Sequence, residues 1–230
     1  MNILAIDTST EACSVALQTS KGIDCEFDVC PQQHSQKILG MIDAVLKRNG
    51  AHLSDMQLLA YGCGPGSFTG VRIAASTMQG LALGTNLPVA EVSTLATMAQ
   101  ENAERFNVSK SLALIDARMS EVYKGQYTLD ATTGGVVLQG EEAVIPPNEV
   151  VSTVVNYDHE SFVGTGYAAY KDILGLTELP KPLNVEYPNA KYMLALAKQA
   201  QLSGKTVSAS EIVPTYLRDK VTWKKLPGRE

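Results

Sequence analysis

The chain has 230 residues, of which 45% are hydrophobic and 19% charged, so it is long enough and apolar enough to bury a sizeable core. Its net charge of −5 argues against nucleic-acid binding spread over the whole surface. No stretch approaches the ~20 apolar residues that cross a bilayer, and the polar residues 7–10 interrupt the first apolar run too early for a signal peptide, so we expect a cytoplasmic protein with no membrane partner.

The cysteines and histidines predict no metal centre. The four cysteines include no C-x-x-C pair, so we expect four free thiols in a reducing cytosol. The three histidines are scattered without the spacing of metal ligands. We therefore expect neither a metal nor a cofactor that this chain binds alone.

The chain opens on a pattern typical of a β-hairpin. An apolar run over residues 2–6 ends at Asp7, and a second apolar run covers residues 12–17 after a polar turn. Asp7, Thr8 and Ser9 at the tip of this hairpin are candidates to hold a phosphate or a metal ion.

Helical and strand patterns alternate after the hairpin. Apolar residues at positions i, i+3, i+4 and i+7 predict a helix over residues 35–49. A short buried strand at 58–61 precedes a second helix over 69–84. A strand at 88–92 and a helix from 93 to about 105 come next. This alternation of strands and helices predicts a mixed α/β sheet.

A glycine-rich turn, GPGSFTG over residues 64–70, leads into the second of these helices. The free backbone N–H groups of such a turn suit anions. The turn lacks the spacing and the lysine of a P-loop, and it lacks the dinucleotide-binding pattern too. We therefore interpret the turn as structural, with Ser67 or Thr69 capping the helix.

The helix after this turn is almost uncharged. Between residues 70 and 84 the only charged residue is Arg72, and apolar or small residues surround the axis. A helix of this kind cannot easily face water. One side can pack on the sheet, whereas the other needs either a neighbouring helix of the same fold or another protein. The pattern leaves both interpretations open.

A later segment repeats the hairpin pattern. An apolar run ends at Asp116, and a returning strand follows over residues 121–127. Asp7 and Asp116 lie 109 residues apart, close to half the chain, which predicts a duplicated α/β unit. We expect two domains, residues 1–106 and 107–230, with the final segment packing back on the first.

The second half of the chain is less regular than the first. Strands are expected at 135–145 and 161–163, and helices over 147–157 and 190–202. The last thirteen residues, 218–230, contain five basic and two acidic residues and so carry a net charge of +3. We interpret them as a solvated terminus, with contact to RNA or to an acidic partner as the alternative.

The second hairpin offers further candidates for a nucleotide cleft. Asp116 is a candidate to face Asp7 across a cleft, as in an ATPase. The turn that follows, Ala117-Arg118, fits poorly because it lacks the glycines that let a backbone approach a phosphate. Gly164 and Gly166 are candidates for an adenosine loop, although a strand-ending turn is the simpler interpretation.

Three segments of the chain closely resemble the TsaB (YeaZ) family. They are residues 3–10, 64–72 and 115–118, of which the glycine-rich block is the most specific. Residues 214–218 and 223–228 look like the tail of the gammaproteobacterial members. The likeness covers essentially the whole chain.

This resemblance implies an actin-like (ASKHA, ribonuclease H-like) α/β fold of two related lobes, the second less regular. It implies a role in forming threonylcarbamoyladenosine at position 37 of tRNAs that read codons beginning with A. In that family the protein is a non-catalytic subunit that pairs with its catalytic paralogue TsaD and works with the ATPase TsaE. TsaD transfers the threonylcarbamoyl group from threonylcarbamoyl-AMP to N6 of adenosine. The resemblance therefore implies that the partner junction is the only possible place for a nucleotide, and that tRNA is bound through the complex.

The metal motif of the paralogue also bears on this chain. TsaD carries a His-x-x-x-His pair on the helix that corresponds to residues 93–105. Thr94 and Met98 occupy the two histidine positions here, and neither replaces a ligand of a hard catalytic metal. The resemblance therefore implies no catalytic residue and no metal ligand in this chain.

The resemblance also implies where a partner docks. In the family the first-lobe helices of TsaB pack against the equivalent helices of TsaD, so we expect the interface on residues 35–49 and 69–84. The same face is expected to form a homodimer when TsaD is absent. The candidate interface residues are Ile38, Met41, Ile42, Val45, Val71, Ala75, Met78 and Ala82.

Two other classes of function remain open on the sequence. One is an independent enzyme of the same superfold, either a small ATP-dependent kinase or an M22 glycoprotease-like peptidase. The other is an RNA-binding module, which rests only on the basic tail.

Overall fold

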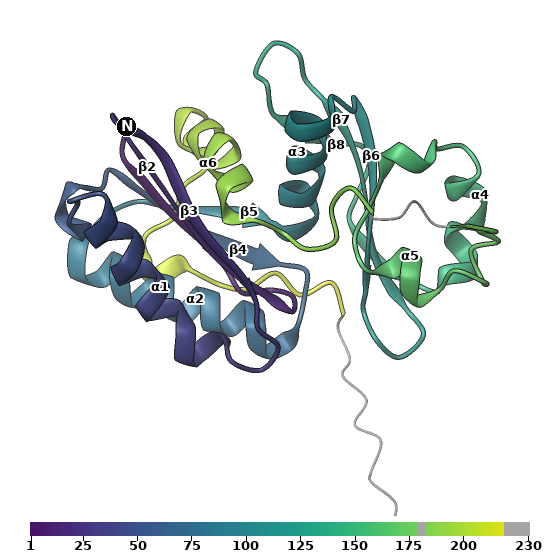
Figure 1. Cartoon of the computed structure of the whole chain (residues 1–230), viewed down its shortest axis with the longest axis horizontal. Helices are drawn as coiled ribbons and strands as arrows, with labels where there is room; N and C mark the ends of the chain where they lie inside the picture. Colours follow the sequence, from purple (N-terminus) through teal and green to yellow (C-terminus); the bar gives the residue numbers. More distant parts are fainter. Residues whose placement is uncertain (179–182, 219–230) are drawn as a thin grey trace, which may run out of the picture.

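A computed structural model describes residues 1–178 and 183–218 and shows two β-sheets, each covered by helices (Figure 1). The first sheet has the strand order β3-β2-β1-β4-β5. Strands β1 to β3 pair antiparallel, whereas β4 pairs parallel to both β1 and β5. The strands are β1 (Ile3–Asp7), β2 (Ala12–Thr19), β3 (Gly22–Val29), β4 (Leu58–Gly64) and β5 (Val89–Ser93).

Helices cover both faces of the first sheet because successive strand residues point to opposite faces. Leu4 and Ile6 share one hydrophobic cluster with α1 (His34–Arg48) and α2 (Phe68–Thr85). Ile3 and Ala5 point to the other face and pack with α6 (Met193–Leu202). The central strand β1 is therefore fully buried, as its unbroken apolar run predicts.

The second sheet has the order β10-β6-β7-β8, and β9 pairs with β7. One face packs against α3 (Thr94–Phe106) and the other against α4 (Val151–Val154) and α5 (Gly166–Ala169). The strands are β6 (Lys110–Asp116), β7 (Val122–Leu129), β8 (Val136–Leu138), β9 (Ala143–Ile145) and β10 (Phe162–Val163). Short 3-10 turns complete the described chain at Leu53–Asp55, Pro147–Val150, His159–Ser161, Ala190–Tyr192 and Ala209–Glu211.

The pairing pattern confirms the predicted duplication. Strand β1 pairs antiparallel with β2 and parallel with β4, and β6 pairs antiparallel with β7 and parallel with β10. Asp7 and Asp116 are the last residues of β1 and β6, so they occupy equivalent places in the two lobes. The second lobe is indeed less regular, since α4 and α5 have only four residues each.

Three features differ from the expected domain organisation. Strand β3 was not expected, and the strand expected at 135–145 is two short strands, β8 and β9. Helix α3, expected within the first domain, packs on the second sheet as well. The segment after α6 packs on the first lobe, which is the arrangement expected for the final segment, and Val207 and Val89 exchange backbone hydrogen bonds of 2.9 Å there. Most of the basic tail, residues 219–230, lies outside the described residues.

The structure contradicts the prediction of the eight interface residues. Each of them is at most 6% exposed, and all except Val71 belong to the cluster between the first sheet and helices α1 and α2. On α1 the prediction was wrong because the four residues form its apolar stripe, which faces the sheet. On α2 it was wrong because the helix is apolar on most sides, so its sequence did not indicate which side faces the sheet. Of the eight residues, Ile38 also lines a groove between the two helices. The outer side of the two helices carries other residues instead, including Leu39, which is 61% exposed, and Leu83, which is 70% exposed.

No helix among the described residues is both long enough and apolar enough to span a membrane.

Candidate functional site

A cleft of about 770 Å³ lies between the two hairpin tips. The starts of α1 and α2 and the C-terminal segment complete its walls. Its lining residues are 9–11, 31, 32 and 34 from the first hairpin and α1, 66–68 and 72 from the glycine-rich turn and α2, 115–118 and 123 from the second hairpin, and 215–218 from the C-terminal segment. Segments far apart in sequence therefore meet at one place.

Asp7 is fully buried and does not line this cleft. Its Oδ1 accepts hydrogen bonds from the backbone N–H of Ser9 (2.9 Å) and from the Ser9 hydroxyl (2.8 Å). Its Oδ2 is buried and has no hydrogen-bond partner among the described residues. A Cβ at Gly62 would lie 1.8 Å from this oxygen, so glycine is required there. Burial of the carboxyl raises its pKa from 3.8 to about 6.

The first hairpin tip is fastened to the glycine-rich turn. The Thr8 hydroxyl donates to the carbonyl of Gly70 at 2.7 Å, and the backbone N–H of Ser67 donates to the carbonyl of Ser9, also at 2.7 Å. The Ser67 hydroxyl accepts from the N–H of Gly70 and so caps α2, which confirms the structural interpretation of the turn. Thr94 donates from its hydroxyl to that of Ser9 at 3.0 Å. The hairpin tip is thus held by the protein's own groups.

We expect Gly70→Ala to destabilise the protein although alanine is the better helix former. A Cβ at Gly70 would lie 2.1 Å from the carbonyl oxygen of Thr8, so the turn and the hairpin would have to separate. Gly80 is the matched control, since it lies in the same helix with open space around it. Gly80→Ala should stabilise the protein by about 0.5–1 kcal/mol. Urea unfolding of both variants checks this, and an equal response would contradict the close packing.

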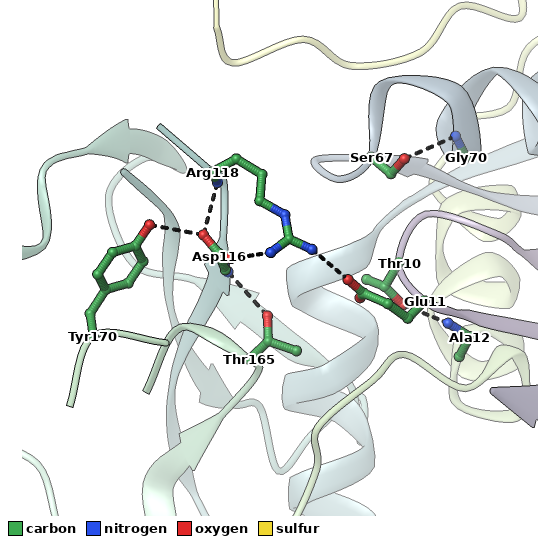
Figure 2. Close-up of polar contacts among 9 residues, drawn as sticks. All are labelled: Thr10, Glu11, Ala12, Ser67, Gly70, Asp116, Arg118, Thr165 and Tyr170. Atoms are coloured by element: carbon green, nitrogen blue, oxygen red, sulfur yellow. Dashed lines mark hydrogen bonds and ion pairs between the residues drawn. The ribbon is translucent and has the colours of Figure 1, made fainter. Parts of the chain in front are cut away.

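Asp116 faces the cleft, but its carboxylate is occupied by neighbouring groups (Figure 2). Oδ1 accepts from the backbone N–H of Arg118 (2.8 Å) and from the hydroxyl of Tyr170 (2.9 Å), and Oδ2 accepts from Nη1 of Arg118 (2.8 Å). The Nη2 atom of Arg118 reaches Oε1 of Glu11 at 2.9 Å, so this guanidinium links the two hairpin tips. The sequence did not predict this bridge because its partners lie 107 residues apart.

The turn that carries Arg118 is strained. Arg118, Met119 and Ser120 have φ values of +61°, +56° and +60°, a region that residues other than glycine rarely adopt. Each such residue costs on the order of 1 kcal/mol. Backbone hydrogen bonds between Ala117 and Glu121 and between Glu121 and Arg118 hold the turn closed. This strained turn holds the side chain of Arg118 at the cleft. This arrangement agrees with the expectation that the turn fits a phosphate poorly.

Gly164 and Gly166 form a packing turn and do not line the cleft. A Cβ at either position would lie within 2.9 Å of the backbone of Leu114, so both glycines are required by close packing against β6. The adenosine-loop prediction is therefore wrong for these two residues, and the strand-ending turn is confirmed.

Thr94 and Met98, the two positions at which the resemblance places the paralogue's histidines, are also buried. The hydroxyl of Thr94 donates a hydrogen bond to the hydroxyl of Ser9, and Met98 packs in the cluster between α3 and the second sheet. Among the residues that the structure describes, no group of three or more histidine, cysteine, aspartate or glutamate side chains is arranged to hold a metal ion.

Two cleft residues that sequence reasoning did not select have unused hydrogen-bonding capacity. The guanidinium of Arg72 lies 3.3 Å from the ring centre of Phe68 and 4.8 Å from that of Tyr216. It donates to the carbonyl of Phe68 at 2.9 Å. His34 is 8% exposed, and its buried Nε2 has no partner within the described chain. The only sequence signal was that Arg72 is the sole charge on its helix.

Comparisons with known proteins find similarity to TsaD and to TsaB. A model of the family described as TsaD, tRNA N6-adenosine threonylcarbamoyltransferase, matches residues 26–226. The tRNA threonylcarbamoyladenosine biosynthesis protein TsaB of Escherichia coli K12 is 46% identical over the full length of both chains. The chain belongs to the TsaB family. TsaB of Haemophilus influenzae is 43% identical, over 100% of this chain and 99% of that protein.

Solved structures of this family confirm the predicted actin-like α/β fold. YeaZ from Pseudomonas aeruginosa has a TM-score of 0.81 and 39% identity, covering 94% of this chain and 99% of the other. A second structure, of a Pseudomonas aeruginosa protein described as similar to peptidase YEAZ, has a TM-score of 0.82 at the same identity and coverage.

We expect Asp7→Asn to flatten the dependence of stability on pH. Because the folded protein holds the Asp7 proton up to a pKa of about 6, the stability linked to this proton is fully present below about pH 4 and is lost as the pH rises to about 6. The difference corresponds to about 3 kcal/mol. The variant, uncharged at every pH, should therefore be at least as stable as the wild type at pH 8. Urea unfolding at pH 5 and pH 8 measures this, and an unchanged pH dependence would contradict it.

Proposed function

We propose that this protein is the non-catalytic TsaB-type subunit required for threonylcarbamoyladenosine formation at position 37 of tRNAs. The observation that carries the proposal is the 46% sequence identity with Escherichia coli TsaB over the full length of both chains. The transfer from threonylcarbamoyl-AMP to N6 of adenosine belongs to TsaD in this proposal, and TsaE and tRNA join through the complex.

The surroundings of the two equivalent aspartates, Asp7 and Asp116, support a non-catalytic role. Asp7 does not line the cleft, and the carboxylate of Asp116 is engaged by Arg118 and Tyr170. A metal-dependent enzyme needs such carboxylates free to coordinate its metal ion. Thr94 and Met98 in place of the paralogue's histidines point the same way.

The outer side of α1 and α2 is the surface on which we place TsaD. Leu39 is exposed there, and a groove of about 380 Å³ runs between the helices, lined by Ser35, Ile38, Leu39, Phe68, Thr69, Arg72, Ile73, Ser76 and Thr77. Cβ atoms at Gly40, Gly80 and Gly84 would meet nothing within 4 Å, so a partner helix could approach the backbone closely. We place the homodimer of the isolated chain on the same surface.

The competing proposal is an independent enzyme, which the words "similarity to peptidase" for one Pseudomonas aeruginosa structure favour. The isolated, purified chain separates the two. We expect neither ATP turnover nor hydrolysis of a protein substrate. Activity that survives stringent purification and disappears on Asp116→Asn would support the independent enzyme instead.

A further inference from the structure

The cleft contains a cation that the described residues leave unneutralised. Three guanidinium groups line it, and two of them are paired: Arg118 with Glu11 and Asp116, and Arg218 with Glu121. Arg72 forms no ion pair with any described carboxylate. Its one printed hydrogen bond goes to the carbonyl of Phe68, although a guanidinium has five N–H donors. Most of its capacity is therefore available to a ligand.

The guanidinium of Arg72 is also held in place. Its stacking on the rings of Phe68 and Tyr216 restricts the plane in which its N–H groups lie. Phe68 and Tyr216 are 51% and 45% exposed, so the guanidinium of Arg72 lies at an open part of the cleft. A planar, preoriented fork of donors matches the two oxygens of a carboxylate.

His34, in the wall of the cleft, has a ring nitrogen without a hydrogen-bond partner among the described residues, but this atom is closed to solvent. The residue lies at the start of α1 and is 8% exposed. No side chain caps the N-terminus of α1 beside it, and this helix end favours negative charge.

The charges of the cleft favour a monoanion over a phosphate chain. Glu11 and Asp116 are paired with Arg118, and Arg218 is paired with Glu121, so Arg72 is the one guanidinium of the lining without an ion pair among the described residues, and a single positive charge matches a monoanion. The hairpin tip that would hold phosphates is instead fastened to the glycine-rich turn through Thr8 and Ser9. The remaining lining is partly apolar, with Ile115, Tyr123 and Leu217.

We infer that this cleft binds a small monocarboxylate with an apolar or aromatic body, with Arg72 as its recognition group and His34 in the wall of the site. The carboxylate pairs with the guanidinium of Arg72, and the body of the ligand lies against the apolar lining. The cavity of about 770 Å³ lies within the usual size of small-molecule sites. Phe68 and Arg72 line this cleft and also the groove assigned above to TsaD and the homodimer, so the ligand and a partner on that groove share these two residues.

The test uses the full chain, labelled with ¹⁵N and ¹³C, and sodium benzoate as the probe. We expect saturable NMR shifts at the Arg72 side chain and the His34 ring, and none with benzamide, which has the same body without the charge. Arg72→Gln should weaken the affinity by about tenfold or more, and Arg72→Lys by less, because lysine keeps the charge but not the fork. Arg48→Gln, on the same helix as His34 but outside the cleft, should bind like the wild type.

Four results would overturn the inference. They are the absence of saturable shifts, equal shifts with benzamide, an unchanged affinity in Arg72→Gln, and tighter Arg72-dependent binding of inorganic phosphate or ADP than of benzoate. The last result would reassign the cleft to phosphate-bearing ligands. Because the titration contains no TsaD, its outcome is separate from that of the proposed function.

Discussion

Replacing Met78 by aspartate should unfold the protein. Met78 is fully buried between α2 and the first sheet, in the cluster that contains Leu59 and Tyr61. Removing a buried methionine side chain costs about 2–5 kcal/mol, and an unpaired buried carboxylate adds several kcal/mol. The sum approaches the whole stability of a typical domain, about 5–15 kcal/mol. Circular dichroism with urea unfolding should show little or no cooperative transition in the variant.

Ser76→Asp is the matched control for this loss. Ser76 lies two residues earlier on the same helix and is exposed. Its substitution should change the free energy of unfolding by about 0.5 kcal/mol or less. A folded Met78→Asp variant would contradict the inward orientation of this side of α2, as would an equally damaged Ser76→Asp variant.

Replacing Leu39 by aspartate should leave the protein folded and weaken its binding to TsaD. Leu39 is 61% exposed on α1 and lines the groove between α1 and α2. An apolar side chain at the centre of an interface commonly contributes about 2 kcal/mol, so we expect the Kd to rise about 30-fold. Titration calorimetry with purified TsaD measures this change.

Leu202→Asp provides the comparison for Leu39→Asp. Leu202 is 79% exposed at the end of α6, which covers the opposite face of the first sheet (Figure 1). The Leu202→Asp variant should therefore bind TsaD with the affinity of the wild type. If both variants lost affinity equally, or if only Leu202→Asp lost it, the α1 and α2 surface would not be the docking site.

Much of the fold was predictable because local patterns determine it. The apolar runs that end at Asp7 and Asp116 predicted β1 and β6, and the helical spacing of apolar residues predicted α1. The glycine-rich turn was interpreted correctly as structural because Ser67 is a typical capping residue. In each of these segments, the residues that decide the local structure lie within a few positions of one another.

The face of α2 was not predictable for a physical reason. Apolar and small residues surround the helix, so its sequence has no polar stripe to mark the outside. Strand β3 was missed although its apolar residues alternate with Asp24, Glu26 and Asp28, a period of two that is typical of a strand and that the prediction did not use. In the structure, Arg48 and Lys37 of α1 form ion pairs with these acidic side chains.

The cleft depends on contacts between distant parts of the chain. Arg118 and Glu11 are in contact although 107 positions separate them, and Arg72 and Tyr216 although an even longer stretch of sequence separates them. Periodicity and motif spacing contain no information on such pairs. Sequence reasoning therefore identified both hairpin aspartates as candidates but did not predict that Asp7 is sealed and Asp116 is occupied.

Reconstituted threonylcarbamoyl transfer tests the central claim most directly. Purified TsaD, TsaE, tRNA and threonylcarbamoyl-AMP are combined with and without this protein, and threonylcarbamoyladenosine is measured. We predict product only when the protein is present, with Leu39→Asp restoring less product than Leu202→Asp at limiting concentration. Full product formation in its absence would contradict the account.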